Sequence, residues 1–322
     1  MIVEPVLRAA TALISPAGTG ARLSTFIFHR VLAQPDPFLP DEPDARRFDE
    51  LLRWIGGQFR VLAPRDACER LAVGTLPERA ALITFDDGYR DNYDIALPLL
   101  RRHGMYAAFF VATGFLNGGM MFNDRVIEAV RGATDTTLDA DWLGLGVLSI
   151  AALSERRAAI GRLLQAVKHR LPHEREQAVQ RIEAQCDSTA RTDLMMTDAQ
   201  VKALHDAGME IGGHTRTHPI LYVLDAAAAQ REIAAGADDL CAVTGERPCL
   251  FAYPNGVPGL DFDERHPPMV RAAGFRHAFT TQAGVATAQT DPYRLPRFTP
   301  WDRSALRFQV RMLRNLFARV RG

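Results

Sequence analysis

Seven short apolar runs, separated by segments with helical periodicity, constrain the fold of this chain more than any other feature. The runs are STFIFHRV (24–31), FRVLAP (59–64), AALITFD (80–86), YAAFFVA (106–112), MEIGG (209–213), CLFAYP (249–254) and FRHAFTT (275–281). Alternation of strand and helix patterns is typical of α/β folds with a mainly parallel sheet. Because the strand and helix unit recurs about seven times, we expect a small barrel rather than an open sheet.

The segments between these runs carry the signals of helices. In DARRFDELLRWIG (44–56), the periodicity predicts a helix with one apolar face. That face consists of Phe48, Leu51, Leu52 and Ile55. Further along, Thr197 and Gln200 form a capping box, and Gly208 ends the predicted helix before the run MEIGG. Both segments fit the helices that connect parallel strands.

Residues 120–196 interrupt this alternation. The segment is long, mostly helical in pattern, as in SERRAAIGRLLQAVKHRL (154–171), and it offers no strong strand. We therefore predict a helical insertion within a single domain that spans residues 1–322. The apolar residues of MMFNDRVIEAV (120–130) and Trp142 either line a substrate groove or pack the insertion itself.

The charge balance gives no sign of a polyanionic partner. Lys plus Arg and Asp plus Glu number 38 each, so bulk charge gives no reason to expect nucleic acid as a partner. The four cysteines lack a CxxC pair, which favours free thiols in a reducing compartment over a disulfide scaffold. The N-terminal stretch lacks the basic lead-in of a signal peptide, and no apolar run approaches the roughly 20 residues that cross a bilayer. We therefore expect a soluble, cytoplasmic protein.

The C-terminal segment 302–322 has the pattern of a basic amphipathic helix. Its arginines lie away from an apolar stripe. The stripe consists of Leu306, Val310, Leu313, Phe317 and Val320. Such a helix either lies on an anionic membrane, which would make the protein peripheral on that membrane, or docks on the barrel or on another subunit.

Polar residues gather at the ends of three predicted strands. Asp86 and Asp87 follow the run AALITF. His214 and His218 follow MEIGG, and Asn255 comes directly after CLFAYP. Because the carboxyl ends of parallel strands meet on one face, functional groups sit there in α/β folds.

Two imidazoles and one carboxylate form a ligand set that binds catalytic Zn²⁺. His214 and His218 could bind one ion if their segment makes a single helical turn. Each motif also has an interpretation without a metal. An HxxxH spacing arises by chance, and aspartates at this position cap helices. Two adjacent acids at a strand end, together with HxxxH, favour the metal site.

Three motifs occur in a specific order: TFDDG (84–88), HTRTH (214–218) and FAYPNG (251–256). Together they resemble those of the NodB-homology polysaccharide deacetylases, carbohydrate esterase family 4, from about residue 80 to about residue 300. The resemblance implies a distorted (β/α)7-type barrel and a divalent metal, usually Zn²⁺.

The same resemblance assigns roles to the motif residues. It implies that Asp87, His214 and His218 bind the metal. Asp86 is then the general base. A bound ion lowers the pKa of its water and polarises the acetyl carbonyl, while the neighbouring carboxylate takes the proton of the water. Asp87 would therefore bind the ion, and Asp86 would take the proton of the water that the ion activates.

The third motif departs from the family pattern, which has an arginine two residues before its proline and an aromatic residue after it. This chain has Ala252 and Asn255 at those positions. The backbone N–H of Asn255 can still donate to an oxyanion, but the base loses its usual orienting partner. Arg297 in YRLPRFTP is the candidate substitute. The alternative is that Arg297 is a surface residue after a strand.

The family's last motif, LxH, is missing near the C-terminal end, where the chain has LPR (295–297). Its histidine protonates the leaving amine. An apolar-x-His pattern at Ile27, Phe28 and His29 resembles instead the circularly permuted branch that includes poly-N-acetylglucosamine deacetylases. His29 is therefore the candidate general acid, provided that the first strand lies beside the last in a closed barrel. The alternative is a strand-end histidine that bonds to the backbone.

These expectations combine into one hypothesis. The chain is a metal-dependent deacetylase that acts on N-acetylated sugars in an exopolysaccharide, another glycan or a glycan precursor, so its partner is an acetylated glycan. Two alternatives stay open: an O-acetyl esterase on a glycan, and a catalytically silent carbohydrate-binding protein with the same fold.

Overall fold

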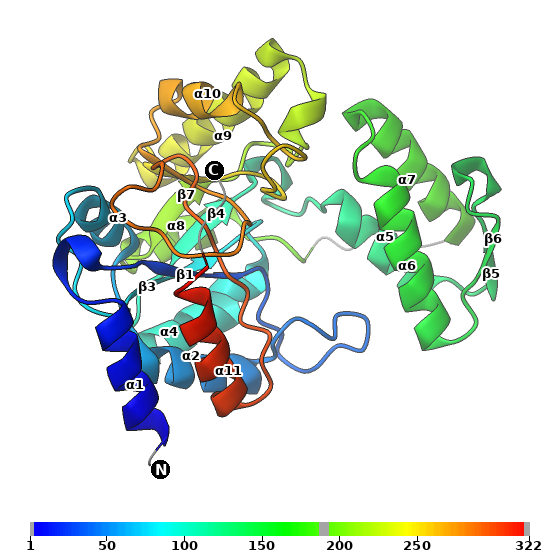
Figure 1. Ribbon diagram of the computed structural model, residues 1–322. Helices are drawn as coiled ribbons and strands as arrows, with labels where there is room; N and C mark the ends of the chain where they lie inside the picture. The colour runs from blue at the N-terminus through cyan, green and yellow to red at the C-terminus, as the bar shows by residue number, and fades with distance from the viewer. Residues whose placement is uncertain (1–2, 187–192, 319–322) are drawn as a thin grey trace.

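The computed structural model describes residues 3–186 and 193–318, and within them the chain folds around a seven-stranded parallel sheet (Figure 1). In spatial order, its strands are β1 (Ser24–Phe28), β3 (Ala80–Phe85), β4 (Ala108–Val111), β7 (Glu210–Gly213), β8 (Leu250–Ala252) and β9 (His277–Phe279), and β2 (Arg60–Val61) pairs with β3. Each strand lies in one of the seven predicted runs. The predicted α/β class is confirmed.

Helices surround the sheet, and several pack directly on its strands. They are α1 (Val3–Ile14), α2 (Ala45–Gln58), α3 (Pro64–Ala72), α4 (Leu97–Arg102), α8 (Asp198–Asp206), α9 (Ala226–Thr244), α10 (His266–Ala272) and α11 (Ala305–Asn315). Helix α3 contacts β3, and both α8 and α9 contact β7. The capping box at Thr197 and Gln200 forms at the start of α8, as predicted.

The strands are continuous apolar runs because both faces of the sheet are covered. Every residue of β1 and β3 is buried. The rings of Phe28, Phe85 and Phe109 stack across three neighbouring strands, with centroid distances of 5.5 and 4.9 Å. Phe48 from α2 meets Phe28 edge-on at 5.2 Å. The predicted apolar face of α2 is therefore the face that packs on the sheet.

The two edges of the curled sheet, β1 and β9, are joined by the extended segment 295–298. Leu295 bridges to Phe279 of β9, and Phe298 bridges to Phe26 of β1. The N–H of Phe298 donates to the carbonyl of Thr25 at 2.8 Å. The first and last strands are thus connected through this segment rather than paired directly.

The predicted insertion forms a lobe with its own apolar core (Figure 1). It contains α5 (Phe122–Gly132), α6 (Leu153–Val167), α7 (Pro172–Cys186) and the antiparallel pair β5 (Thr137–Asp139) and β6 (Val147–Ser149). The sequence did not predict this hairpin, because three-residue strands leave almost no periodic signal. Trp142 is partly buried against the core of this lobe, under the guanidinium of Arg181. The single-domain assignment stays a prediction.

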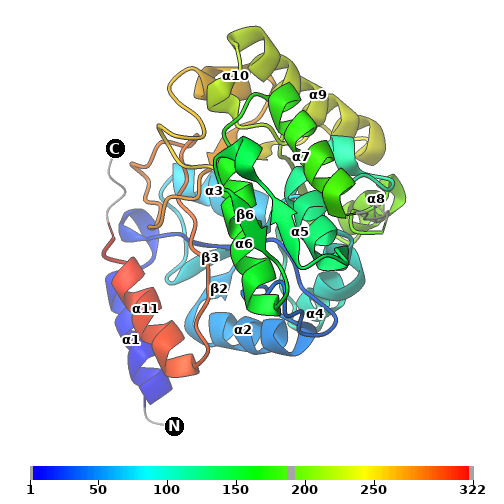
Figure 2. The ribbon, with the colours of Figure 1, turned by 90° about the vertical axis from the view of Figure 1, so that its right-hand side faces the viewer.

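Helix α11 packs on the protein, against α1 and α2 (Figure 2). Phe308 and Met312 join the main core, and Phe308 lies 6.1 Å from the ring of Phe26. The predicted apolar stripe is not the buried face, since Leu306 and Phe317 are 55% and 64% exposed. The last residues of the predicted helix, Val320 included, lie outside the described residues. Of the two alternatives given for this helix, docking on the protein is therefore the one that the structure shows. The packing of the helix gives no support to contact with a membrane.

Among the described helices, none combines the length and apolarity needed to span a membrane.

Two glycines give opposite predictions for stability. A Cβ on Gly212 of β7 would lie 2.5 Å from the Phe110 ring and 2.9 Å from the carbonyl of Leu250. Gly212→Ala should therefore lower the free energy of unfolding by about 1–3 kcal/mol. Gly161 lies in α6 with open space around its Cβ position, so Gly161→Ala should raise it by about 0.5–1 kcal/mol. Chemical denaturation measures both, and shifts of the same sign would contradict this packing.

Candidate active site

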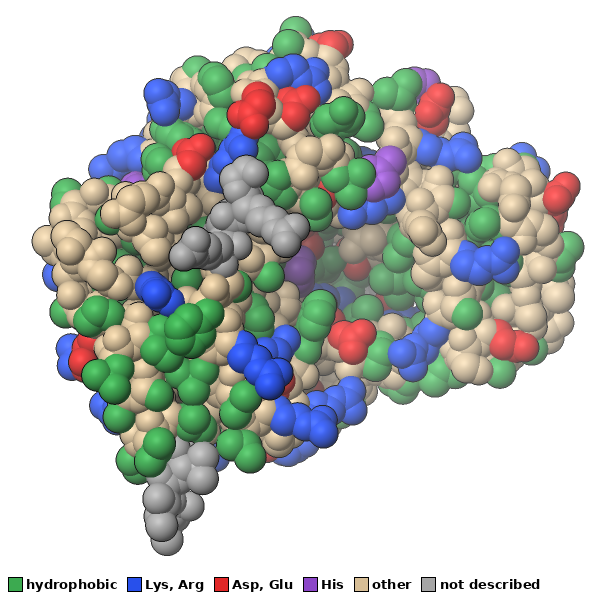
Figure 3. All heavy atoms as spheres, viewed as in Figure 1, with side chains coloured by type: hydrophobic (Ala, Val, Ile, Leu, Met, Phe, Trp, Pro, Cys, Tyr) green, Lys and Arg blue, Asp and Glu red, His purple; other side chains and the backbone are tan. Residues whose placement is uncertain are grey.

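A pocket of about 370 Å³ lies at the carboxyl ends of the strands. Figure 3 shows the hollow between the body of the protein and the inserted lobe, with histidine and acidic side chains inside it. The pocket is lined by His29, Asp86, Asp87, Met121, Phe122, Asn123, Leu164, Gln165, Lys168, His214, His218, Asn255 and Thr281. Six of the seven predicted site residues are in this set, and the seventh, Arg297, contacts Asp86 directly.

Asp87, His214 and His218 form a compact, buried cluster. The Nε2 atoms of both histidines lie 3.4 Å from the same oxygen, Oδ1 of Asp87. One ligand atom from each residue lies within 4.8 Å of the other two. The Nδ1 of His214 lies 2.7 Å from the carbonyl of Ala252, so Nδ1 carries the proton and Nε2 presents its lone pair to the cluster.

The protonation of His218 also suits a metal ligand. Burial, together with the charges of His214 and Arg175, lowers the pKa of His218 to about 3 against the opposing effect of Asp87. The imidazole is therefore neutral at physiological pH. Two imidazoles beside a carboxylate form a donor set that fits Zn²⁺. The residues present thus fit the metal that the resemblance implies.

The backbone brings these residues together without the predicted helical turn. His214 directly follows β7, and residues 214–218 form a bend. Thr215 and His218 have positive φ values of 64° and 51°. The hydroxyl of Thr215 accepts a hydrogen bond from the N–H of His218 at 3.1 Å, which closes the bend. The helical interpretation of HxxxH is wrong, because two left-handed residues turn the chain instead.

Asp86 forms a bidentate ion pair with Arg297. The Nη1–Oδ1 and Nη2–Oδ2 distances are 2.6 and 2.7 Å. The Nε of Arg297 donates to the carbonyl of Thr280 at 2.9 Å. Burial raises the pKa of Asp86, but Arg297, together with His214 and His29, outweighs burial and holds this pKa below its ordinary value. Because Arg297 is only 1% exposed, its interpretation as a surface residue is wrong.

Asn255 presents its backbone to the same pocket. Its φ is 59°, and its carbonyl accepts a hydrogen bond from the hydroxyl of Thr281 at 2.6 Å. The N–H of Asn255 has no hydrogen-bond partner in the part of the chain that the structure describes. A donor without a protein partner at a pocket wall is available to a substrate oxygen.

His29 follows β1 and lines the pocket together with His214 and His218. Within the described residues, no hydrogen bond joins its ring to the backbone. Burial lowers the pKa of His29, but nearby carboxylates outweigh this effect and raise that pKa above its ordinary value. These carboxylates belong to Asp87, Asp86 and Glu42. His29 thus lies in the pocket with a pKa that favours its protonated form, and its role as the general acid stays a prediction.

The sequence analysis did not predict several residues that lie in or near the pocket. Gln165 and Lys168 reach the pocket from α6 and the residue that follows it, and Glu42 lies close enough to influence His29. No motif marks them, since α6 has the composition of an ordinary surface helix. Met121 and Phe122 were predicted to line a groove or to pack the lobe, and they line the pocket. Trp142 does not line it.

The sequence matches a family model described as "Polysaccharide deacetylase" over residues 73–135 and 167–278. It is 32% identical over 93 residues to a protein of Bacillus subtilis (strain 168) named "Putative polysaccharide deacetylase YxkH". That alignment covers 28% of this chain and 32% of the relative, so the chain matches about a third of the relative's length.

Solved structures resemble most of the chain. The Streptococcus pyogenes deacetylase PplD, solved with acetate, superposes with a TM-score of 0.60 at 17% identity, covering 92% of this chain and 99% of that one. IcaB from Ammonifex degensii gives 0.60 at 20% identity, covering 92% and 98%. A de-N-acetylase from Aggregatibacter actinomycetemcomitans gives 0.53 at 15%, covering 86% and 94%. Likeness at these identities establishes the fold.

The family model covers more than half of the residues, and its matched segments contain Asp86, Asp87 and both histidines of the cluster. The likeness to solved deacetylases extends the shared fold over most of the chain. Sequence and fold agree, and we conclude that the chain belongs to the polysaccharide deacetylase family.

Proposed function

We propose that the protein is a metal-dependent deacetylase of N-acetylated sugars in a glycan or glycan precursor. The main support for this proposal is that two groups lie in one pocket. One is the cluster of Asp87, His214 and His218. The other is the ionised Asp86, paired with Arg297. A ligand set without a base would suit a structural metal site. A base beside it suits hydrolysis.

Asp87, His214 and His218 would hold the ion, most plainly Zn²⁺ given two imidazoles and one carboxylate. When bound, the ion lowers the pKa of a water molecule and polarises the acetyl carbonyl. Asp86 is ionised and held by Arg297, so its carboxylate can accept the proton of the attacking water. Arg297 acts as a positioning residue through Asp86.

The remaining steps use two other groups at the pocket wall. The N–H of Asn255 donates to the carbonyl oxygen as that oxygen gains negative charge. The raised pKa of His29 keeps its imidazole protonated to higher pH, and a protonated His29 can give its proton to the leaving nitrogen. The products are acetate and a free amine.

Two alternatives remain as competing proposals. An O-acetyl ester fits the same pocket chemistry, because its leaving alkoxide also accepts a proton. A silent carbohydrate-binding protein would keep the fold without turnover; the buried ion pair of Asp86 and Arg297 argues against it, since such a pair is costly to bury. Release of acetate from a panel of N- and O-acetylated sugars, with and without chelator, separates the three.

The two aspartates should have separable effects on metal content. Asp87→Asn should remove most of the bound ion, because it replaces a charged ligand with a neutral amide. Asp86→Asn should keep about one ion per chain but lower kcat by about 10² to 10⁴, because proton abstraction is lost. Metal analysis and acetate release measure these outcomes. Equal metal loss in both variants would contradict the division of roles.

Arg297→Lys should lower kcat by about 10- to 100-fold with metal content unchanged, because lysine keeps the charge but loses the bidentate geometry. Arg297→Ala is unsuitable, since leaving Asp86 buried without its partner costs about 3–5 kcal/mol. If Arg297 acts through Asp86, Arg297→Lys should have little further effect in an Asp86→Asn background. Full additivity of the two changes would disprove this coupling.

His29→Ala should affect substrates according to their leaving group. An amine must be protonated to leave, whereas the phenolate of an activated aryl acetate departs unaided. N-deacetylation should therefore fall by about 10² to 10⁴ while aryl acetate hydrolysis stays near the wild-type rate. His205→Ala, before β7 and at the opposite end of that strand from His214, is the control. An equal loss on both substrates would exclude His29 as the acid.

A further inference from the structure

Two larger hollows flank the active-site pocket and share residues with it. One, of about 700 Å³, shares His29 with the pocket. The other, of about 1110 Å³, shares Thr281 with it. Each of the two larger hollows therefore adjoins the active-site pocket at one shared residue. Adjoining hollows suit a chain of sugars better than a single sugar.

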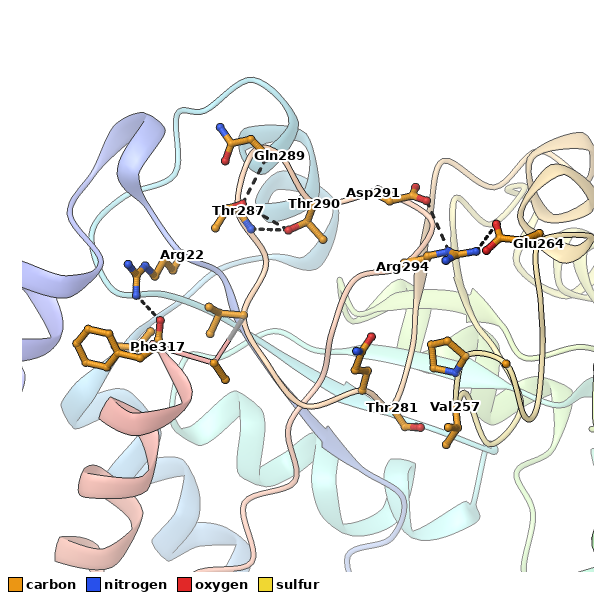
Figure 4. Close-up of a pocket in the computed structure, with 16 residues that line it drawn as sticks. Arg22, Val257, Glu264, Thr281, Thr287, Gln289, Thr290, Asp291, Arg294 and Phe317 are labelled. Carbon is orange, nitrogen blue, oxygen red and sulfur yellow. Dashed lines mark hydrogen bonds and ion pairs between the residues drawn. The ribbon is translucent and has the colours of Figure 1, made fainter. Parts of the chain in front are cut away.

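The hollow that shares Thr281 has mostly satisfied polar groups (Figure 4). Arg294 pairs with both Glu264 and Asp291, and Thr287 accepts a hydrogen bond from Gln289. Arg22, the other arginine of this hollow, donates to the carbonyl of Leu316. The hollow therefore offers little that is specific to a ligand.

The hollow that shares His29 is different, because an indole ring lines it. Trp301 is 66% exposed. A tryptophan in water leaves a large apolar surface uncovered, and single exposed apolar residues are common on proteins. The position of Trp301 is what distinguishes it: it lies in the same hollow as His29 and only four residues after Arg297.

The backbone under Trp301 is held firmly in place by Arg311 of α11. The guanidinium of Arg311 donates to the carbonyl of Thr299 at 2.9 Å and to Asp302 at 2.7 Å. It also lies 4.4 Å from the ring centroid of Phe298. The residues on both sides of Trp301 are thus fixed while the indole itself stays exposed, which is the arrangement of a preorganised contact surface.

Hydrogen-bonding groups accompany the indole. Asp41 and Arg303 line the same hollow. Neither side chain forms an ion pair or hydrogen bond within the described residues. An aromatic face covers the apolar C–H face of a pyranose ring, and charged side chains beside it can bond to the ring hydroxyls.

We propose that Trp301, with Asp41 and Arg303, forms a subsite that binds a pyranose ring next to the sugar being deacetylated. This inference rests on the proposed function, since it places the reacting sugar in the pocket with His29. It implies that the enzyme prefers an oligomer to a monosaccharide. The indole contributes to substrate binding and takes no part in the chemistry.

The test compares substrates of different length. Trp301→Ala should raise KM for a pentamer of N-acetylglucosamine, in β-1,4 or β-1,6 linkage, about tenfold, the size of one aromatic contact. Its kcat, and the hydrolysis of an activated aryl acetate, should stay unchanged. Trp301→Phe should restore most of the loss. Tyr106→Ala, an exposed aromatic residue before β4 at the opposite end of the strands, is the matched control and should behave as wild type.

Two results would overturn the subsite: an unchanged KM for both pentamers, or an equal loss with the aryl acetate. If the wild-type chain releases no acetate from any sugar, the proposed function fails, and binding alone tests the subsite. Calorimetric titration of each pentamer into Asp86→Asn, with and without Trp301→Ala, then gives the answer. About tenfold weaker binding without the indole supports the subsite, and equal binding, or no binding to either chain, refutes it.

Discussion

The buried ion pair between Asp86 and Arg297 joins the fold to the site. Arg297 belongs to the extended segment 295–298 that connects the sheet edges β1 and β9, while Asp86 directly follows β3, the strand beside β1. Burying two charges is costly unless their geometry is good, and here it is bidentate with further hydrogen bonds. The same segment therefore joins the sheet edges through its backbone and holds the carboxylate in place through Arg297.

The pocket concentrates unusual backbone conformations. Asp87, Thr215, His218 and Asn255 all have positive φ, and the described residues contain only two other non-glycine examples, Arg79 and Asn117. Such conformations cost free energy and persist where the surroundings enforce them. Gly88 belongs to the same turn as Asp87. Its φ is 93°, and a Cβ there would lie 2.9 Å from the side chain of Val111. Strain is thus placed where side chains from three strands must converge.

The strands and the cluster of Asp87, His214 and His218 could be predicted because their signals are local. An apolar run buried on both faces needs no partner to be recognised, and the motifs around Asp87 and His214 are contiguous. Non-local features could not be predicted. The buried face of α11 is set by where Phe308 and Met312 meet the core, and the helix sequence fits a second stripe equally well. Lys168 reaches the pocket only because of how the inserted lobe is oriented.

The ion pair that completes the site also has a consequence for biosynthesis. Asp86 and Arg297 are 211 residues apart along the chain, so the carboxylate leaves the ribosome long before its arginine. Contacts between residues so far apart in the sequence form late in folding, because the entropy cost of closing the loop between them must be overcome first. A nascent chain can already hold the strands β1 to β8, yet its sheet edges stay unjoined and Asp86 stays unpaired. The candidate active site is therefore among the last parts of the molecule to mature.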